Sequence, residues 1–126
     1  PKEKGERALL NFGHTLGHAI EKEMNFSLYH GECVVLGMIA ALNICVELGT
    51  ISSEERDDAL KTFAMYEFPD HVTGINIDDV VAVSKNDKKM DAGKVKFILL
   101  KSVGDAYIDR NISDEQMKKA LEGVIR

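Results

Sequence analysis

The stretch Asn11-Phe-Gly-His-Thr-Leu-Gly-His-Ala-Ile-Glu21 decides how the rest of this 126-residue sequence is interpreted. It carries two histidines four residues apart, His14 and His18, and a third, His30, opens the next apolar segment. Residues four apart on an α-helix lie on one face, about one turn from each other. The spacing therefore predicts a helix face on which two imidazoles could bind metal, with packed or hydrogen-bonded histidines as the alternative.

This stretch lies in a helix expected over residues 6 to about 24, where apolar residues recur at steps of three and four. Gly13 and Gly17 interrupt the helix, each at a cost of up to about 1 kcal/mol relative to alanine. Such glycines indicate that a ligand or another backbone approaches closely, and tight helix–helix packing explains them equally well. Residues 1–5 are expected to form an entry loop.

The remaining segments predict a mainly α fold, a helical bundle with a small β-hairpin, in one domain over residues 1–126. Residues 31–48 are apolar nearly all round, which is typical of a central helix, and Gly49 is placed to end it. Two Ser-x-x-Glu/Gln capping boxes, at Ser52 and Ser113, predict a third helix and a last helix that runs to the chain end. A short helix is expected over 78–85, and a hairpin over 95–100 and 106–109.

Composition excludes several classes of protein. The net charge of -5 argues against nucleic-acid binding. The longest apolar run, 33–46, is shorter than a membrane span. Cys33 and Cys45 are too far apart on one helix to bond to each other, so both are expected to be reduced, as in the cytoplasm. The start at Pro1, without an initiator methionine, suggests a piece of a larger protein.

A lysine-rich loop forms a second candidate site. The alternatives are a solvated loop or a site for a phosphate or carboxylate, which Arg7 could join as a bidentate partner. Its cationic residues are Lys85, Lys88, Lys89, Lys94 and Lys96. There is no G-x-G-x-x-G motif, so no dinucleotide site is expected within the chain.

Together these motifs closely resemble 3-dehydroquinate synthase. The resemblance rests on the segment from Arg7 to Glu21, on His30-Gly-Glu-Cys-Val, on Asp87-Lys88-Lys89 and on Phe97-Ile-Leu-Leu, in that order and at the family's separations. It implies that the chain is the C-terminal metal-binding helical domain of a two-domain enzyme, without the N-terminal NAD-binding domain. The implied reaction converts 3-deoxy-D-arabino-heptulosonate 7-phosphate to 3-dehydroquinate with release of phosphate, the second step of the shikimate pathway.

The resemblance also implies cofactors and partners. The family is an NAD- and metal-dependent carbon–oxygen lyase that uses NAD+ and Zn2+ or Co2+, and the full-length protein is expected to be a cytoplasmic homodimer. The partners would be the sugar phosphate and the N-terminal domain, with no nucleic acid and no membrane. The 126 residues alone are expected to be inactive.

Residue roles follow from the same resemblance. His14 and His30 would be metal ligands, and the third ligand would lie outside this chain. His18 would be a catalytic residue that faces the substrate, and Gly13 and Gly17 would leave room for it. The substrate-binding set would comprise Glu3, Arg7, Asn11, His18, Lys88 and Lys89, where one lysine of the pair makes the contact.

Two other functions remain open from the sequence. One is another sugar-phosphate cyclase, or an iron-type polyol or alcohol dehydrogenase, with the same two-domain plan. The other is a non-catalytic helical module in which the histidines merely pack.

Overall fold

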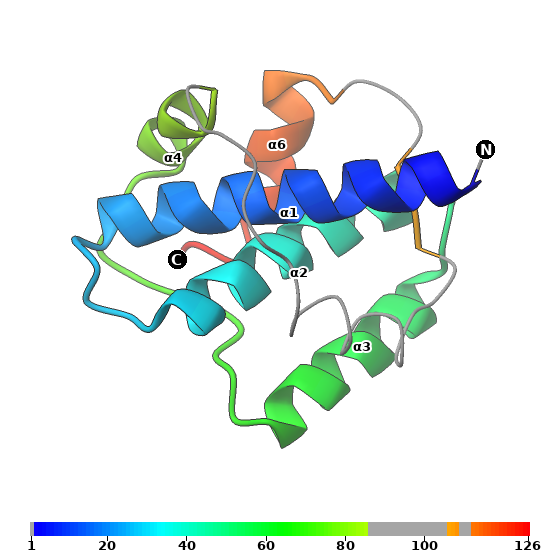
Figure 1. The fold of residues 1–126 in the computed structure, drawn as a ribbon, viewed down its shortest axis with the longest axis horizontal. Coiled ribbons are helices and arrows are strands. Elements are labelled where there is room, and N and C mark those ends of the chain that lie inside the picture. The colour runs from blue at the N-terminus through cyan, green and yellow to red at the C-terminus, as the bar shows by residue number, and fades with distance from the viewer. Residues whose placement is uncertain (1, 86–105, 109–111) are drawn as a thin grey trace.

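Two long antiparallel helices form the centre of the molecule (Figure 1). The computed structural model describes residues 2–85, 106–108 and 112–126. Helix α1 spans Lys2–Glu23 and α2 spans His30–Leu48. Residues 2–5 are therefore helical, and the predicted entry loop at this position is wrong. Helix α2 ends at Gly49, whose φ of 80° is the left-handed conformation expected of a C-terminal glycine.

Glycines on both helices allow α1 and α2 to touch backbone to backbone. A Cβ atom on Gly37 would lie 2.0 Å from the carbonyl oxygen of Gly13, and one on Gly17 would lie 2.7 Å from the carbonyl oxygen of Cys33. A Cβ on Gly13 would meet the Met38 side chain at 2.0 Å. The glycines of α1 thus make room for α2, which corrects the interpretation that they make room for substrate.

Three shorter helices among the described residues surround this pair. Figure 1 shows α3 (Ser53–Met65) below it, and α4 (Ile77–Ser84) and α6 (Asp114–Leu121) above it. Both predicted capping boxes are present: Ser52 accepts from the backbone N–H of Glu55, and Ser113 accepts from that of Gln116. The main fold prediction, a mainly helical bundle, is confirmed.

Helix α2 is the core of the bundle. Its buried side chains run without interruption from Cys33 to Leu42. By length and composition α2 could cross a membrane, but 67% of its most apolar window is buried inside the protein. A helix with no polar face, covered by neighbours on several sides, fits the centre of a bundle.

The end of the chain differs from prediction. Helix α6 stops at Leu121, and the last residues turn back to form a parallel β-bridge between Val72 and Ile125. The backbone N–H of Arg126 donates to the Val72 carbonyl at 2.8 Å. Residues 95–105 and 109 of the predicted hairpin lie outside the described residues. The described Ala106–Ile108 segment forms no strand, and the N–H of Ile108 donates to the Gly5 carbonyl of α1.

Candidate functional site

A carboxylate lies between two of the histidines. The Nδ1 atom of His30 lies 3.2 Å and 3.3 Å from the two carboxylate oxygens of Glu21, and His18 Nδ1 lies 3.4 Å from Glu21 Oε1. Glu21 is 7% exposed as a residue, whereas half of the His30 side chain is exposed. The site is thus a buried carboxylate that contacts two imidazoles, one of which is half exposed to solvent.

Local backbone structure places these three side chains together. His18 and Glu21 lie one turn apart near the end of α1, and His30 is the first residue of α2. The connection reverses direction through Asn25 and Phe26, both with positive φ. Its N–H groups donate to the last carbonyls of α1, including Phe26 N to Glu21 O at 3.0 Å. Because the antiparallel helices meet at this turn, the end of α1 lies beside the start of α2.

His14 lies deeper in the molecule than His18. It is 1% exposed and belongs to the largest fully buried side chains, whereas the His18 side chain is 22% exposed. The packing of Gly13 and Gly17 against α2 places His14 level with Gly37, about two turns (~10 Å) along α2 from His30. The two histidines of the i, i+4 pair therefore lie in different environments on one helix.

The predicted substrate residues of α1 fall on the same helix face. Because α1 is continuous, steps of four, three and four residues align Arg7, Asn11, His14 and His18 along one stripe, and Glu21 follows one turn later. Arg7 is exposed and Asn11 is half-buried. By register Glu3 begins the stripe, but its side chain lies outside what is described.

The lysine-rich loop is largely beyond the described residues. Lys88, Lys89, Lys94 and Lys96 all lie outside them, so their roles stay predictions. Lys85 is exposed at the end of α4 and forms an ion pair with Asp114 of α6. This contact ties α4 to α6.

The two cysteines are buried thiols. Burial, and to a smaller extent the charges of Glu21 and Glu32, together raise the pKa of Cys33 to about 12. Burial likewise raises the pKa of Cys45 to about 11, against hydrogen bonds with Thr50 and Tyr107 that lower it. Both side chains are therefore thiols at neutral pH, which does not favour a role as nucleophile.

His30 has the arrangement expected of a metal-binding histidine. Ligating histidines usually direct one ring nitrogen to a carboxylate or carbonyl and offer the other to the metal. The Nδ1 atom of His30 is directed to Glu21, which leaves its Nε2 for another partner. Within residues 2–85, 106–108 and 112–126, no group of three histidine, cysteine, aspartate or glutamate side chains is arranged to hold a metal ion. The structure therefore fits His30 as one metal ligand. A complete ligand set would need a donor from outside the described residues.

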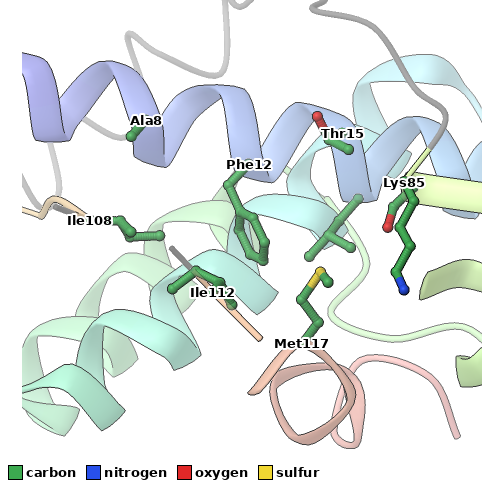
Figure 2. Close-up of a pocket in the computed structure, with 9 residues that line it drawn as sticks. Ala8, Phe12, Thr15, Lys85, Ile108, Ile112 and Met117 are labelled. Carbon is green, nitrogen blue, oxygen red and sulfur yellow. The ribbon is translucent and has the colours of Figure 1, made fainter. Parts of the chain in front are cut away.

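A cavity of about 300 Å³ opens beside a different set of α1 residues (Figure 2). Phe12 and Thr15 line it from α1, Met117 lines it from α6, and Lys85 lies at one side. Its remaining lining residues are Ala8, Leu16, Ser84, Ile108 and Ile112. None of the predicted metal or substrate residues contributes to this mainly apolar cavity, so it is separate from the histidine site.

Comparison with known proteins gives the family. A family model described as 3-dehydroquinate synthase C-terminal matches residues 1–90. The chain belongs to the 3-dehydroquinate synthase family. Curated 3-dehydroquinate synthases from Acinetobacter baumannii (strain AYE) and Acetivibrio thermocellus are 40% and 42% identical over 95% of this chain. The 3-dehydroquinate synthase of Nostoc punctiforme is 39% identical over 98% of it.

The matched region is only part of these relatives. The chain spans about a third of their length: 34%, 33% and 34% of the proteins from A. baumannii, A. thermocellus and N. punctiforme. No solved structure matches the chain. Membership of the 3-dehydroquinate synthase family confirms the resemblance seen in the sequence, and the described residues correspond to the mainly helical C-terminal portion.

The sequence motifs did not assign a role to Glu21. Its spacing of three residues from His18 places it near the same helix face, which is the available sequence signal. That signal does not reveal His30 as the second partner, because this contact joins two helices. Glu21 is therefore the residue that the structure adds to the histidines predicted from the sequence.

Proposed function

We propose that this chain is the C-terminal part of a 3-dehydroquinate synthase. The whole enzyme would convert 3-deoxy-D-arabino-heptulosonate 7-phosphate to 3-dehydroquinate and release phosphate, as a carbon–oxygen lyase of the shikimate pathway and aromatic amino acid biosynthesis. The observation that carries the proposal is the His30–Glu21 contact at the end of a helix stripe that also holds the predicted substrate residues. Family membership supports the same assignment.

His14 and His30 would bind a divalent metal, Zn2+ or Co2+. The metal supplies Lewis-acid polarisation of substrate hydroxyl groups, and NAD+, bound mainly outside this chain, supplies a reversible hydride acceptor. The buried His14 and the outward-facing His30 lie on adjoining helices, and a third ligand would come from another part of the enzyme. Imidazole nitrogens are donors that suit both metals.

The remaining side chains would bind and orient the substrate. Arg7 suits a carboxylate or phosphate because its guanidinium can donate two parallel hydrogen bonds, and Asn11 can contact a hydroxyl. His18 is partly exposed beside Glu21, so its ring can face the substrate and move a proton at Nε2. Glu3 and one of Lys88 and Lys89 would complete the polar set. Holding both anionic ends of a flexible sugar phosphate fixes it in one reactive pose.

The wider setting follows from this proposal. The N-terminal domain of the same enzyme would complete the active site, and the full-length protein would be a cytoplasmic homodimer without nucleic-acid or membrane partners. The 126 residues alone would have no turnover, because the NAD+ site and one metal ligand lie elsewhere.

The test is an assay of the intact protein with the heptulosonate phosphate, NAD+ and Zn2+ or Co2+. Phosphate release together with formation of 3-dehydroquinate is the expected result. Release of phosphate with a different cyclic product would indicate another sugar-phosphate cyclase, and NADH accumulation from a polyol without phosphate release would indicate a dehydrogenase. Either product would overturn the assignment.

The isolated 126 residues provide a second test. They should give no product under the same conditions. Measurable turnover by them alone would contradict the proposed division of the active site.

A further inference from the structure

The Glu21 carboxylate contacts both histidines through the same type of atom. Each imidazole presents Nδ1 to the carboxylate. His30, at the start of α2, lies at hydrogen-bond distance, whereas His18, one turn earlier on α1, lies at 3.4 Å and makes an electrostatic contact. A neutral imidazole whose Nδ1 faces a carboxylate carries its proton on Nδ1, which leaves Nε2 as an acceptor or ligand. Glu21 therefore favours the same tautomer in both rings and directs both Nε2 atoms away from itself.

We propose that Glu21 is a shared positioning residue, whose one carboxylate holds His18 and His30 in their Nδ1–H tautomers and fixes the relative placement of the two rings. The partners of the two Nε2 atoms rest on the proposed function: a metal for His30 and the substrate for His18. A displacement of Glu21 then moves both rings together, which links the metal ligand to the substrate-facing histidine.

Burial shields this carboxylate from solvent. Its side chain is 10% exposed, so solvent screens its contacts weakly, and a buried carboxylate must be paired with donors. Both of its oxygens lie within 3.3 Å of His30 Nδ1. The neighbouring acid of α2, Glu32, instead accepts from the backbone N–H of Tyr29 at the helix start. Glu21 is therefore the carboxylate that serves the two rings, while Glu32 fixes the helix end.

A purely structural role is the competing explanation, because Glu21 also joins the ends of α1 and α2. The two explanations differ in what they predict for a Glu21 variant that stays folded. A tie between helices affects stability alone, whereas a positioning residue also affects how strongly the Nε2 atom of His30 binds a metal.

The first experiment uses the intact protein labelled with 15N-histidine and measures the tautomer of each ring by NMR. His18 and His30 should be Nδ1–H tautomers in the unaltered protein. Glu21→Gln should raise the Nε2–H population of both rings, Glu21→Asp should restore part of the original pattern, and the matched control Glu23→Gln on the same helix should leave it unchanged. Far-UV circular dichroism verifies that each variant is folded.

The second experiment measures Co2+ affinity of the same proteins without substrate. Glu21→Gln should weaken binding about 10- to 100-fold, the usual cost of losing a hydrogen bond behind a metal ligand. Glu23→Gln should bind as the unaltered protein does.

These readouts separate the two proposals. Unchanged tautomers in a folded Glu21→Gln protein, or tautomers already of the Nε2–H form in the unaltered protein, would overturn the role of Glu21 whether or not metal binds. Absence of Co2+ uptake by the unaltered protein would instead count against the proposed metal function, and the tautomers would still decide the role of Glu21.

Discussion

The Nδ1 atom of His30 lies 3.2 Å from the carboxylate of Glu21, although nine positions separate them in sequence. This contact joins the last turn of α1 to the first residue of α2. About two turns away, Gly13 and Gly37 bring the same two helices into backbone contact. The glycine crossing and the His30–Glu21 contact therefore depend on one relative placement of α1 and α2.

Gly37→Ala should strongly destabilise the protein. The added Cβ would lie 2.0 Å from the Gly13 carbonyl oxygen and 2.5 Å from the Gly17 nitrogen, and backbone atoms cannot rotate away as side chains do. Inserting a methyl group into a packed interior costs about 1–3 kcal/mol, occasionally more. The urea unfolding midpoint should fall accordingly.

Gly31→Ala is the matched control in the same helix. Among the described residues, a Cβ at this position meets the Phe68 ring alone, at an ordinary 3.8 Å. The helix preference for alanine should therefore raise stability by up to about 1 kcal/mol. Equal unfolding midpoints for the two variants would show that the crossing does not require a glycine at position 37.

Local signals predicted the helices well. Ser52, Ser113 and Gly49 act at helix ends through bonds within a few residues, so the sequence pattern contains all of the relevant partners. Helix α2 was predictable because a helix that is apolar nearly all round must be covered by neighbours, as at the centre of a bundle. The end of α6 was not, because the bridge between Val72 and Ile125 joins distant segments.

The site was predictable in composition but not in arrangement. The spacing of His14 and His18 gave one helix face, yet a pattern within one helix does not show that His14 is buried beside α2 while His18 stays partly exposed. The two explanations for Gly13 and Gly17 also required knowledge of the neighbouring element. The contact between Glu21 and His30 depends on how two helices cross, which no local pattern encodes.

Alkaline pH should destabilise the protein through its buried thiols. The pKa of Cys33 is raised from 9.0 to about 12 in the folded protein, so the folded state keeps a proton that the unfolded state loses. The stabilising effect is complete below about pH 9 and is lost as the pH rises from there toward 12. Each such thiol lowers the unfolding free energy by about 1.4 kcal/mol per pH unit in that window.

Urea unfolding between pH 8 and 10.5 measures this slope, and Cys33→Ala provides the comparison. The variant starts from lower stability, but its unfolding free energy should fall less steeply with pH. The difference in slope should correspond to about one proton, or about 1.4 kcal/mol per pH unit. Parallel slopes for the two proteins would mean that the Cys33 thiol ionises as readily in the folded state as in the unfolded state.

Ser52→Ala should destabilise α3. The Ser52 hydroxyl accepts from the Glu55 N–H at 3.1 Å, and the Ser52 N–H donates to the Glu55 carboxylate at 3.0 Å. Loss of such a cap costs about 1 kcal/mol. The neighbouring exposed Ser53 lies inside the helix, so Ser53→Ala should be neutral or slightly stabilising in thermal unfolding. A smaller loss for Ser52→Ala than for Ser53→Ala would contradict the role of the capping box.

His30→Ala should abolish tight metal binding by the intact protein. The Nε2 atom of His30 would bind the metal directly, so its loss should lower Zn2+ or Co2+ affinity by at least about 100-fold, the upper end of the cost of losing only a supporting hydrogen bond. His14→Ala should have a similar effect on affinity, with an added loss of stability because this side chain is buried. Isothermal titration after removal of bound metal with a chelator measures both.

His71→Ala is the control for that measurement. His71 also pairs with a carboxylate, that of Asp70 at 2.7 Å, but it lies between α3 and α4 and is not part of the α1 stripe. Its replacement should leave metal affinity unchanged, although it removes the hydrogen bond that lowers the pKa of Asp70. If His71→Ala and His30→Ala weakened binding equally, the metal would not be held specifically at His30. Full affinity in both His30→Ala and His14→Ala would place the metal at a different site.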